Sequence, residues 1–106
     1  MPEPFGHQLL IDCYQCEGEA LDDLNACHAL LLNLVDVLGV QVQAPPFVFR
    51  TDATQFPDKA GLSGWVPLVE SGIQIHTLMP RRFASLDVYS CHAIDETEVL
   101  ARVKHW

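Results

Sequence analysis

Three side chains in the second half of the sequence have the types and spacing of a reactive set. Ser71 lies where a turn is expected between two strands, and Gly72 after it permits a tight or strained backbone. His76 follows five residues later on the next predicted strand, and Cys91 lies near the end of a further one. Brought together by adjacent strands, they would supply a nucleophile, a base and an acid. On spacing alone, a structural serine in a turn and a structural histidine in a strand remain open alternatives.

The other cysteines predict no metal site. Cys13 and Cys16 form a C-x-x-C motif, which is compatible with half a zinc site or with a redox pair. A structural zinc site usually needs a second pair at comparable spacing, and Cys27 with Cys91 does not supply one. We therefore expect reduced cysteines, as is usual in the cytosol.

Length and composition predict one soluble domain over residues 1–106. The chain is 49% hydrophobic and 19% charged, which excludes a disordered tail. It contains no apolar run long enough to cross a membrane, and no positive charge precedes an apolar stretch at the N-terminus, so we expect a cytoplasmic protein without a membrane partner. Six Lys and Arg against fourteen Asp and Glu give a net charge of −8. This charge disfavours nucleic acid and attracts a small cationic molecule.

The first half of the sequence predicts a strand and a long helix. Residues 7–14 have the pattern of a strand, and a turn is expected at 17–19. Residues 20–38 carry apolar side chains every three to four positions, which predicts an amphipathic helix that Gly39 ends. Residues 40–43 alternate as a strand does, and the strand is expected to continue through 47–49, with the Pro45–Pro46 pair marking an edge or a break.

The second half predicts three more strands and a last helix. A loop is expected at 51–61, and apolar segments follow at 62–69, 73–79 and 83–91. Asp95 with Glu98 three residues later is typical of a helix start. The order β-α-β-β-β-β-α predicts an α+β two-layer sandwich, in which two helices cover one face of a mostly antiparallel sheet of four to five strands. Because the other face stays open, we expect a homo-oligomer, and specifically a homodimer.

Several segments together resemble the prokaryotic S-adenosylmethionine decarboxylase family, whose members use a pyruvoyl group. Ser63 lies eight residues before Ser71, His76 five after it, and Cys91 fifteen after His76, as in the family pattern. The segments that carry the resemblance are Gly6-His7, Tyr14-Gln15-Cys16-Glu17, Gly61-Leu62-Ser63-Gly64, Val69-Glu70-Ser71, Ile75-His76-Thr77 and Asp87-Val88-Tyr89-Ser90-Cys91.

The resemblance implies that the chain makes its own cofactor. The Ser71 hydroxyl would attack the Glu70 carbonyl, and elimination would then leave a β chain, 1–70, and an α chain, 71–106, that begins with a pyruvoyl group. Ser63 would donate to the oxyanion, and His76, as a largely neutral imidazole, would take the Ser71 Cα proton. The pyruvoyl group would hold the substrate amine as a Schiff base. Cys91, a thiol that carries its proton at neutral pH, would be the general acid.

The sequence departs from the family where substrate specificity is set. The family has a glutamate four residues after the histidine, which holds the ribose of the substrate, whereas this chain has Pro80. Three functions therefore stay open: a decarboxylase of S-adenosylmethionine for polyamine synthesis, a related arginine or ornithine decarboxylase, and an unprocessed, non-catalytic binding or regulatory subunit. Phe49 or Phe56 is a candidate to stack on an adenine, and Arg81 to bind a substrate carboxylate.

Overall fold

A single antiparallel sheet is the framework of the molecule. The computed structural model describes residues 3–106, and Met1 and Pro2, the start of the N-terminal segment considered above, lie outside the described residues. The five strands are arranged in the order β1-β5-β4-β3-β2. Their bounds are β1 His7–Cys13, β2 Phe47–Arg50, β3 Leu62–Leu68, β4 Ser71–Leu78 and β5 Phe83–Ser90.

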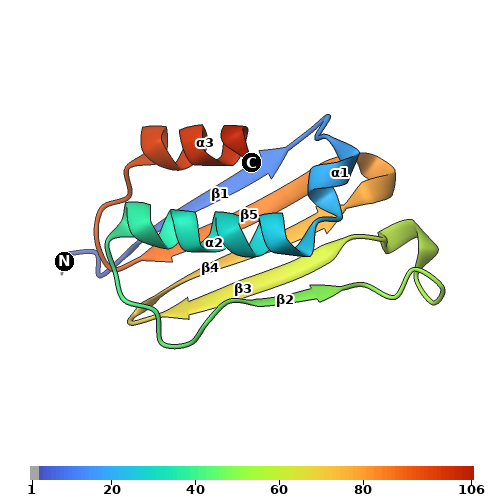
Figure 1. Ribbon diagram of the computed structural model, residues 1–106. Coiled ribbons are helices and arrows are strands. Elements are labelled where there is room, and N and C mark those ends of the chain that lie inside the picture. The colour runs from blue at the N-terminus through green and yellow to red at the C-terminus, as the bar shows by residue number, and fades with distance from the viewer. Residues whose placement is uncertain (1–2) are drawn as a thin grey trace.

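The helices form a second layer on one face of this sheet (Figure 1). The helices are α1 Gly18–Leu21, α2 Leu24–Leu38 and α3 Glu96–His105, and two short 3-10 turns, η1 Pro57–Lys59 and η2 Met79–Arg81, lie in the loops. The predicted α+β two-layer sandwich is therefore confirmed. The predicted start of the last helix is confirmed too, because the Asp95 carboxylate accepts the backbone N–H of Glu98 at 3.1 Å.

The predicted helix over residues 20–38 is interrupted at Asp22 and Asp23. Asp23 has an extended backbone, and its side chain accepts a hydrogen bond from the N–H of Ala26. Asp23 is therefore the N-cap of a separate helix, α2. The Arg50 guanidinium from β2 donates one hydrogen bond to the Asp22 carboxylate, at 3.0 Å, and another to the Asp22 backbone carbonyl, at 2.8 Å. The turn expected at 17–19 is also wrong, because α1 begins at Gly18. The predicted stop is confirmed, with Gly39 at φ 67.

The strand predicted over 40–43 does not form. Val42 makes an isolated bridge to Leu68, and the regular strand β2 begins only at Phe47. The Pro45–Pro46 pair explains the interruption, because proline has no N–H to offer a sheet ladder. As the proline pair suggested, β2 is an edge strand.

Strict alternation along β3, β4 and β5 separates a buried face from an open one. The side chains that face the helices are buried, among them Val66, Ile73, Ile75 and Leu86. Thr77 lies on the same buried face. Its hydroxyl accepts the N–H of Leu62 at 2.8 Å and donates to the carbonyl of Leu21 at 2.7 Å, which ties α1 to the sheet.

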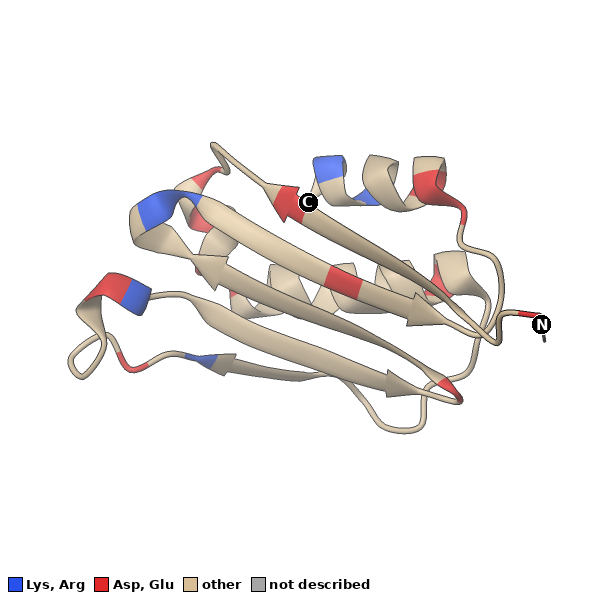
Figure 2. Ribbon diagram, turned by 180° about the vertical axis from the view of Figure 1, so that it is seen from behind, with Lys and Arg blue, Asp and Glu red and all other residues tan. Residues whose placement is uncertain are grey.

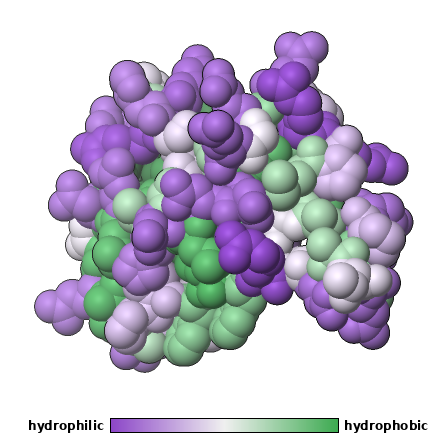
Figure 3. Space-filling view, turned by 45° about the vertical axis from the view of Figure 1, so that its right-hand side comes forward, coloured by the Kyte–Doolittle hydropathy of each residue, from purple (hydrophilic) through white to green (hydrophobic). Residues whose placement is uncertain are grey.

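The opposite face of the sheet has no covering layer within the described chain. Figure 2 shows few charged residues across it, and its exposed side chains include Leu10, Phe47, Phe49, Trp65 and Tyr89. In Figure 3, which views the molecule from another side, hydrophilic side chains dominate the upper part and apolar ones gather in the lower part. No helix among the described residues is long and apolar enough to span a bilayer.

Candidate functional site

Ser71 and Cys91 meet at one end of the sheet. Ser71 is the first residue of β4, and Cys91 directly follows β5. The backbone N–H of Cys91 donates to the Ser71 hydroxyl oxygen at 3.1 Å, and that hydroxyl lies 3.8 Å from the Cys91 sulfur, to which it donates. Both residues are half-buried. The serine oxygen is thus held in place by one donor and lies beside a group that can exchange a proton with it.

The turn before Ser71 places the backbone strain two residues earlier than expected. Val69 and Glu70 connect the paired residues Leu68 and Ser71, and Glu70 adopts φ 57, a left-handed conformation that disfavours a side chain. The expectation that Gly72 supplies the strained backbone is wrong, because Gly72 lies inside β4 opposite Tyr89. The residue that contributes the Glu70–Ser71 carbonyl is therefore itself the strained one.

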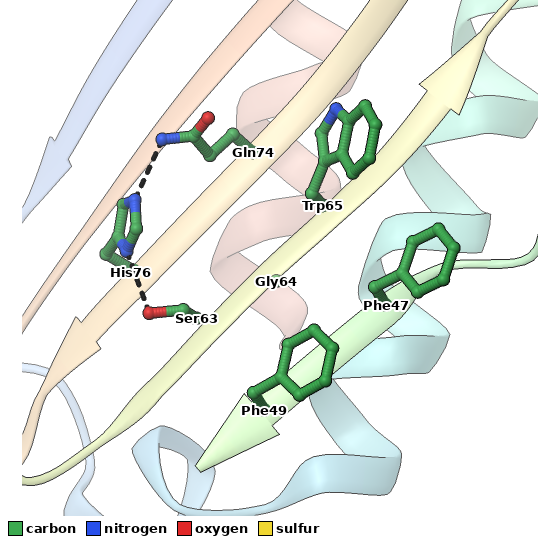
Figure 4. Close-up of a pocket in the computed structure, with 7 residues that line it drawn as sticks. All are labelled: Phe47, Phe49, Ser63, Gly64, Trp65, Gln74 and His76. Carbon is green, nitrogen blue, oxygen red and sulfur yellow. Dashed lines mark hydrogen bonds between the residues drawn. The ribbon is translucent and has the colours of Figure 1, made fainter. Parts of the chain in front are cut away.

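His76 and Ser63 form a second polar pair on the open face. They are directly opposite each other on β4 and β3, with the Ser63 hydroxyl 3.1 Å from His76 Nδ1. The other ring nitrogen, Nε2, lies 2.8 Å from the side-chain nitrogen of Gln74. Figure 4 shows the imidazole between these two partners.

Within one chain, the two polar pairs are far apart. Ser71 and His76 are five positions apart along β4, which corresponds to about 16 Å at the rise of a strand. An odd spacing also directs the two side chains to opposite faces of the sheet. The structure therefore brings Ser71 together with Cys91, and Ser63 together with His76, but it does not bring the histidine to the serine of the same chain.

A shallow depression of about 490 Å³ adjoins the His76 pair (Figure 4). It is lined by Phe47, Phe49, Ser63, Gly64, Trp65, Gln74 and His76. Of the predicted substrate-binding residues, Phe49 is thus at this site. Phe56 lies in the loop before η1, and Arg81 lines a separate depression with Tyr14, Leu78 and Phe83.

Three residues of the depression were not anticipated from the sequence. Gln74 precedes His76 by two positions and therefore shares its face, a signal that strand alternation alone could have given. Phe47 and Trp65 are opposite each other on β2 and β3 and stack with ring centroids 5.8 Å apart. Their pairing depends on the register across the sheet, which the sequence does not specify.

The C-x-x-C motif is not near either polar pair. Burial raises the pKa of the Cys13 thiol, and the neighbouring Cys16 and Asp12 raise it further. Across the described part of the chain, no three His, Cys, Asp or Glu side chains gather in a way that could hold a metal ion. All four cysteines carry free thiols.

The fold and its side-chain pairs define a small α+β protein with candidate nucleophilic and acid–base groups on neighbouring strands. The family model described as S-adenosylmethionine decarboxylase matches residues 7–105, nearly the whole chain. The protein therefore belongs to the S-adenosylmethionine decarboxylase family.

Relatives from bacteria and archaea agree with this assignment. The S-adenosylmethionine decarboxylase proenzyme of Syntrophomonas wolfei is 30% identical over 89 residues, which cover 84% of this chain and 65% of that protein. The proenzyme of Thermococcus kodakarensis is also 30% identical, over 84% of this chain and 57% of its own length. The proenzyme of Methanococcus vannielii is 29% identical, over 89% of this chain and 73% of its own length. The chain thus spans less than two thirds of the length of the first two.

A solved structure has the same fold. The crystal structure of the adenosylmethionine decarboxylase from Aquifex aeolicus matches 98% of this chain and 78% of its own, with a TM-score of 0.74 and 21% identity. At this identity the likeness concerns the arrangement of strands and helices.

Proposed function

We propose that the protein is a self-processing, pyruvoyl-dependent decarboxylase that acts on S-adenosylmethionine for polyamine synthesis. The observation that carries this proposal is the Ser71–Cys91 pair directly after the strained Glu70. The Ser71 oxygen attacks the Glu70 carbonyl carbon, the hydroxyl proton passes to the Ser71 nitrogen, and the C–N bond of the peptide breaks to give an ester and a free amine. Strain of about 1–3 kcal/mol at a distorted residue favours this uphill exchange.

The residues at the turn fit the pyruvoyl group that would remain at position 71 once the ester is eliminated as the carboxylate of chain 1–70 and water replaces the amine nitrogen, which leaves as ammonia. The hydroxyl that is lost in making the group lies beside the Cys91 sulfur, 3.8 Å away. Once formed, the group supplies an electron sink for loss of a carboxylate from a substrate amine. Cys91 stays close to position 71 through β5 and is placed to return a proton there as general acid.

We infer that Ser63 and His76 act on the Ser71 of a second copy. A chain cannot bring its own His76 to its own Ser71 without breaking the register of β4. In a two-fold dimer joined through the open faces, the Ser63–His76 pair of each copy would meet the Glu70–Ser71 turn of the other at the end of β4. It would reach the backbone of that turn, because the Ser71 side chain itself lies on the opposite face of the sheet. The sparse charge and exposed aromatic side chains of that face suit burial against a second sheet. Ser63 would then donate to the oxyanion, and His76 would take the Cα proton.

Co-expression of two inactive variants tests this arrangement. Ser71→Ala and His76→Ala should each stay uncleaved alone. Together, mixed dimers would pair the intact Ser71 of one chain with the intact His76 of the other, so about half of the His76→Ala chains should be cleaved under random pairing. Intact-mass measurement, with a mass tag on one chain, identifies the fragments 1–70 and 71–106. Cleavage of neither chain in the mixture would contradict a shared site.

The identity of the substrate has a second candidate, because η2 lacks a carboxylate. Where a ribose-binding glutamate would be expected, the chain has Pro80, followed by the exposed Arg81. Loss of a charged acceptor weakens binding by about 1.5–3 kcal/mol, roughly ten- to over a hundredfold. The missing carboxylate is the reason to keep a second candidate function, an arginine or ornithine decarboxylase that uses the same chemistry. The aromatic depression that contains Phe49 supports the nucleoside substrate.

Carbon dioxide release from the three substrates decides between these functions. Activity with S-adenosylmethionine supports the first proposal, and activity confined to arginine or ornithine replaces it with the second. A wild-type chain that keeps a single intact mass would instead identify an unprocessed, non-catalytic subunit. A cytoplasmic location, predicted from the sequence, is part of the proposal.

A further inference from the structure

The His76 ring has a partner at each nitrogen, and the two partners differ in what they can do. The Ser63 hydroxyl, 3.1 Å from Nδ1, can donate or accept a hydrogen bond. The Gln74 side-chain nitrogen, 2.8 Å from Nε2, can only donate. All three side chains project from the same face of β3 and β4 (Figure 4).

The chemistry of Gln74 decides which ring nitrogen carries the proton. Because the amide nitrogen donates, Nε2 of His76 must accept, and a ring that accepts at Nε2 is neutral with its proton on Nδ1. Nδ1–H then donates to the Ser63 oxygen. The Ser63 hydroxyl proton is consequently not used by the histidine and is free to point elsewhere.

We propose that Gln74 is a positioning residue that holds His76 as the Nδ1–H tautomer. This leaves the ring lone pair on Nε2, which takes a proton when the Gln74 N–H turns aside, and it frees the Ser63 hydroxyl to stabilise an oxyanion. This inference rests on the proposed function and deepens it. The base and the oxyanion donor would otherwise compete, since a Ser63 hydroxyl that donates to His76 has no proton left for an oxyanion. Gln74 assigns one task to each group.

The surroundings of His76 leave Gln74 as its partner at Nε2. Ser85 of β5 is directly opposite His76, and Asp12 of β1 is opposite Ser85 in turn. Asp87 of β5 is opposite Gln74, but its carboxylate oxygen accepts a hydrogen bond from the side-chain nitrogen of Gln8 at 3.0 Å. These two carboxylates are the charged groups that the neighbouring strands of the described chain place on this face near the ring.

Nitrogen-15 NMR of histidine-labelled protein reads the tautomer directly. The full-length Ser71→Ala chain is used, because it cannot cleave. We expect a neutral ring protonated at Nδ1. Gln74→Leu should remove the preference, and Gln74→Glu, which can only accept, should move the proton to Nε2. Gln55→Leu, the same chemical change at an exposed position in the loop before η1, should leave the His76 signals unchanged.

Cleavage rates measured with Ser71 intact provide the second readout. With the base nitrogen blocked by its proton, Gln74→Glu should cleave at least tenfold more slowly at neutral pH, as expected for a lost general base. A smaller loss is expected for Gln74→Leu and none for Gln55→Leu. An Nε2–H tautomer in the parent chain, or Gln74 variants that change neither tautomer nor rate, would overturn the inference. If the wild type never cleaves but the NMR result is as expected, the proposed function fails while the tautomer assignment stands.

Discussion

Replacement of Glu70 by glycine tests whether backbone strain drives the cleavage. Glu70 is held at φ 57, where a residue with a side chain pays about 1–2 kcal/mol relative to its relaxed conformation. Glycine adopts this conformation freely. If the strain is released when the Ser71 oxygen attacks, Glu70→Gly removes the same amount of driving force and should slow cleavage roughly 5- to 30-fold. In a Ser71→Ala background, the same change should raise the free energy of unfolding by about 1 kcal/mol, because flexibility gained by the unfolded chain offsets part of the relief.

Two further residues provide controls for this measurement. Gln15 and Arg82 also adopt left-handed conformations, at φ 56 and 49, but neither adjoins the bond between 70 and 71. Gln15→Gly should therefore raise stability in the same way while leaving cleavage unchanged. Arg82→Gly should also leave cleavage unchanged but gain less stability, because it loses the 2.9 Å hydrogen bond from its side chain to the Cys16 carbonyl. Cleavage is followed as the decay of the full-length mass, and stability by urea unfolding. If Glu70→Gly is stabilised yet cleaves as fast as wild type, strain at the turn plays no part in the reaction.

Three other predictions concern stability. Thr77→Val leaves two buried backbone groups unpaired and should cost about 1–3 kcal/mol in urea unfolding, whereas Thr77→Ser should cost less because it keeps the hydroxyl. Burial raises the pKa of Cys27 from 9.0 to about 11, so the unfolded thiol loses its proton first, and stability should fall as pH rises through this range. That fall should be weaker in Cys27→Ala but retained in Cys16→Ala. Gly61→Ala places a methyl carbon 2.1 Å from the Thr77 carbonyl oxygen and should destabilise the fold more than Gly39→Ala, whose methyl meets nothing within 4 Å.

Much of the architecture follows from local patterns that the sequence displays. The Asp95–Glu98 start, the Gly39 stop and the three strands of the second half depend on neighbours within a few residues, and their physics is local. The break at Asp22–Asp23 was missed because the apolar spacing continues across it, while the cap of α2 and the contact with Arg50 override that pattern. Residues 40–43 are a second such case. Their side chains alternate as in a strand, but the structure assigns this segment an isolated bridge, from Val42 to Leu68, in place of a regular strand.

The candidate site was predictable as a set of residues but not as an arrangement. Spacing and family resemblance singled out Ser71, His76, Cys91 and Ser63, and the sheet register then decided how they meet. Ser71 approaches Cys91 because the start of β4 adjoins the end of β5, while an antiparallel register places Ser63 opposite His76. Neither relation is a property of sequence spacing. Similarly, Gln74 gains significance only because its side chain reaches Nε2 of the ring.

The geometry of the sheet separates the two polar pairs within one chain. Strain is stored most readily in a tight turn, which must lie at the end of a strand, and Glu70 occupies such a turn. A histidine locked between two hydrogen-bond partners needs the regular spacing of the strand interior, where His76 lies. One strand cannot satisfy both demands at the same point. The proposed dimer would satisfy both demands, because an axis placed between the two copies would set the interior of one β4 against the end of the other.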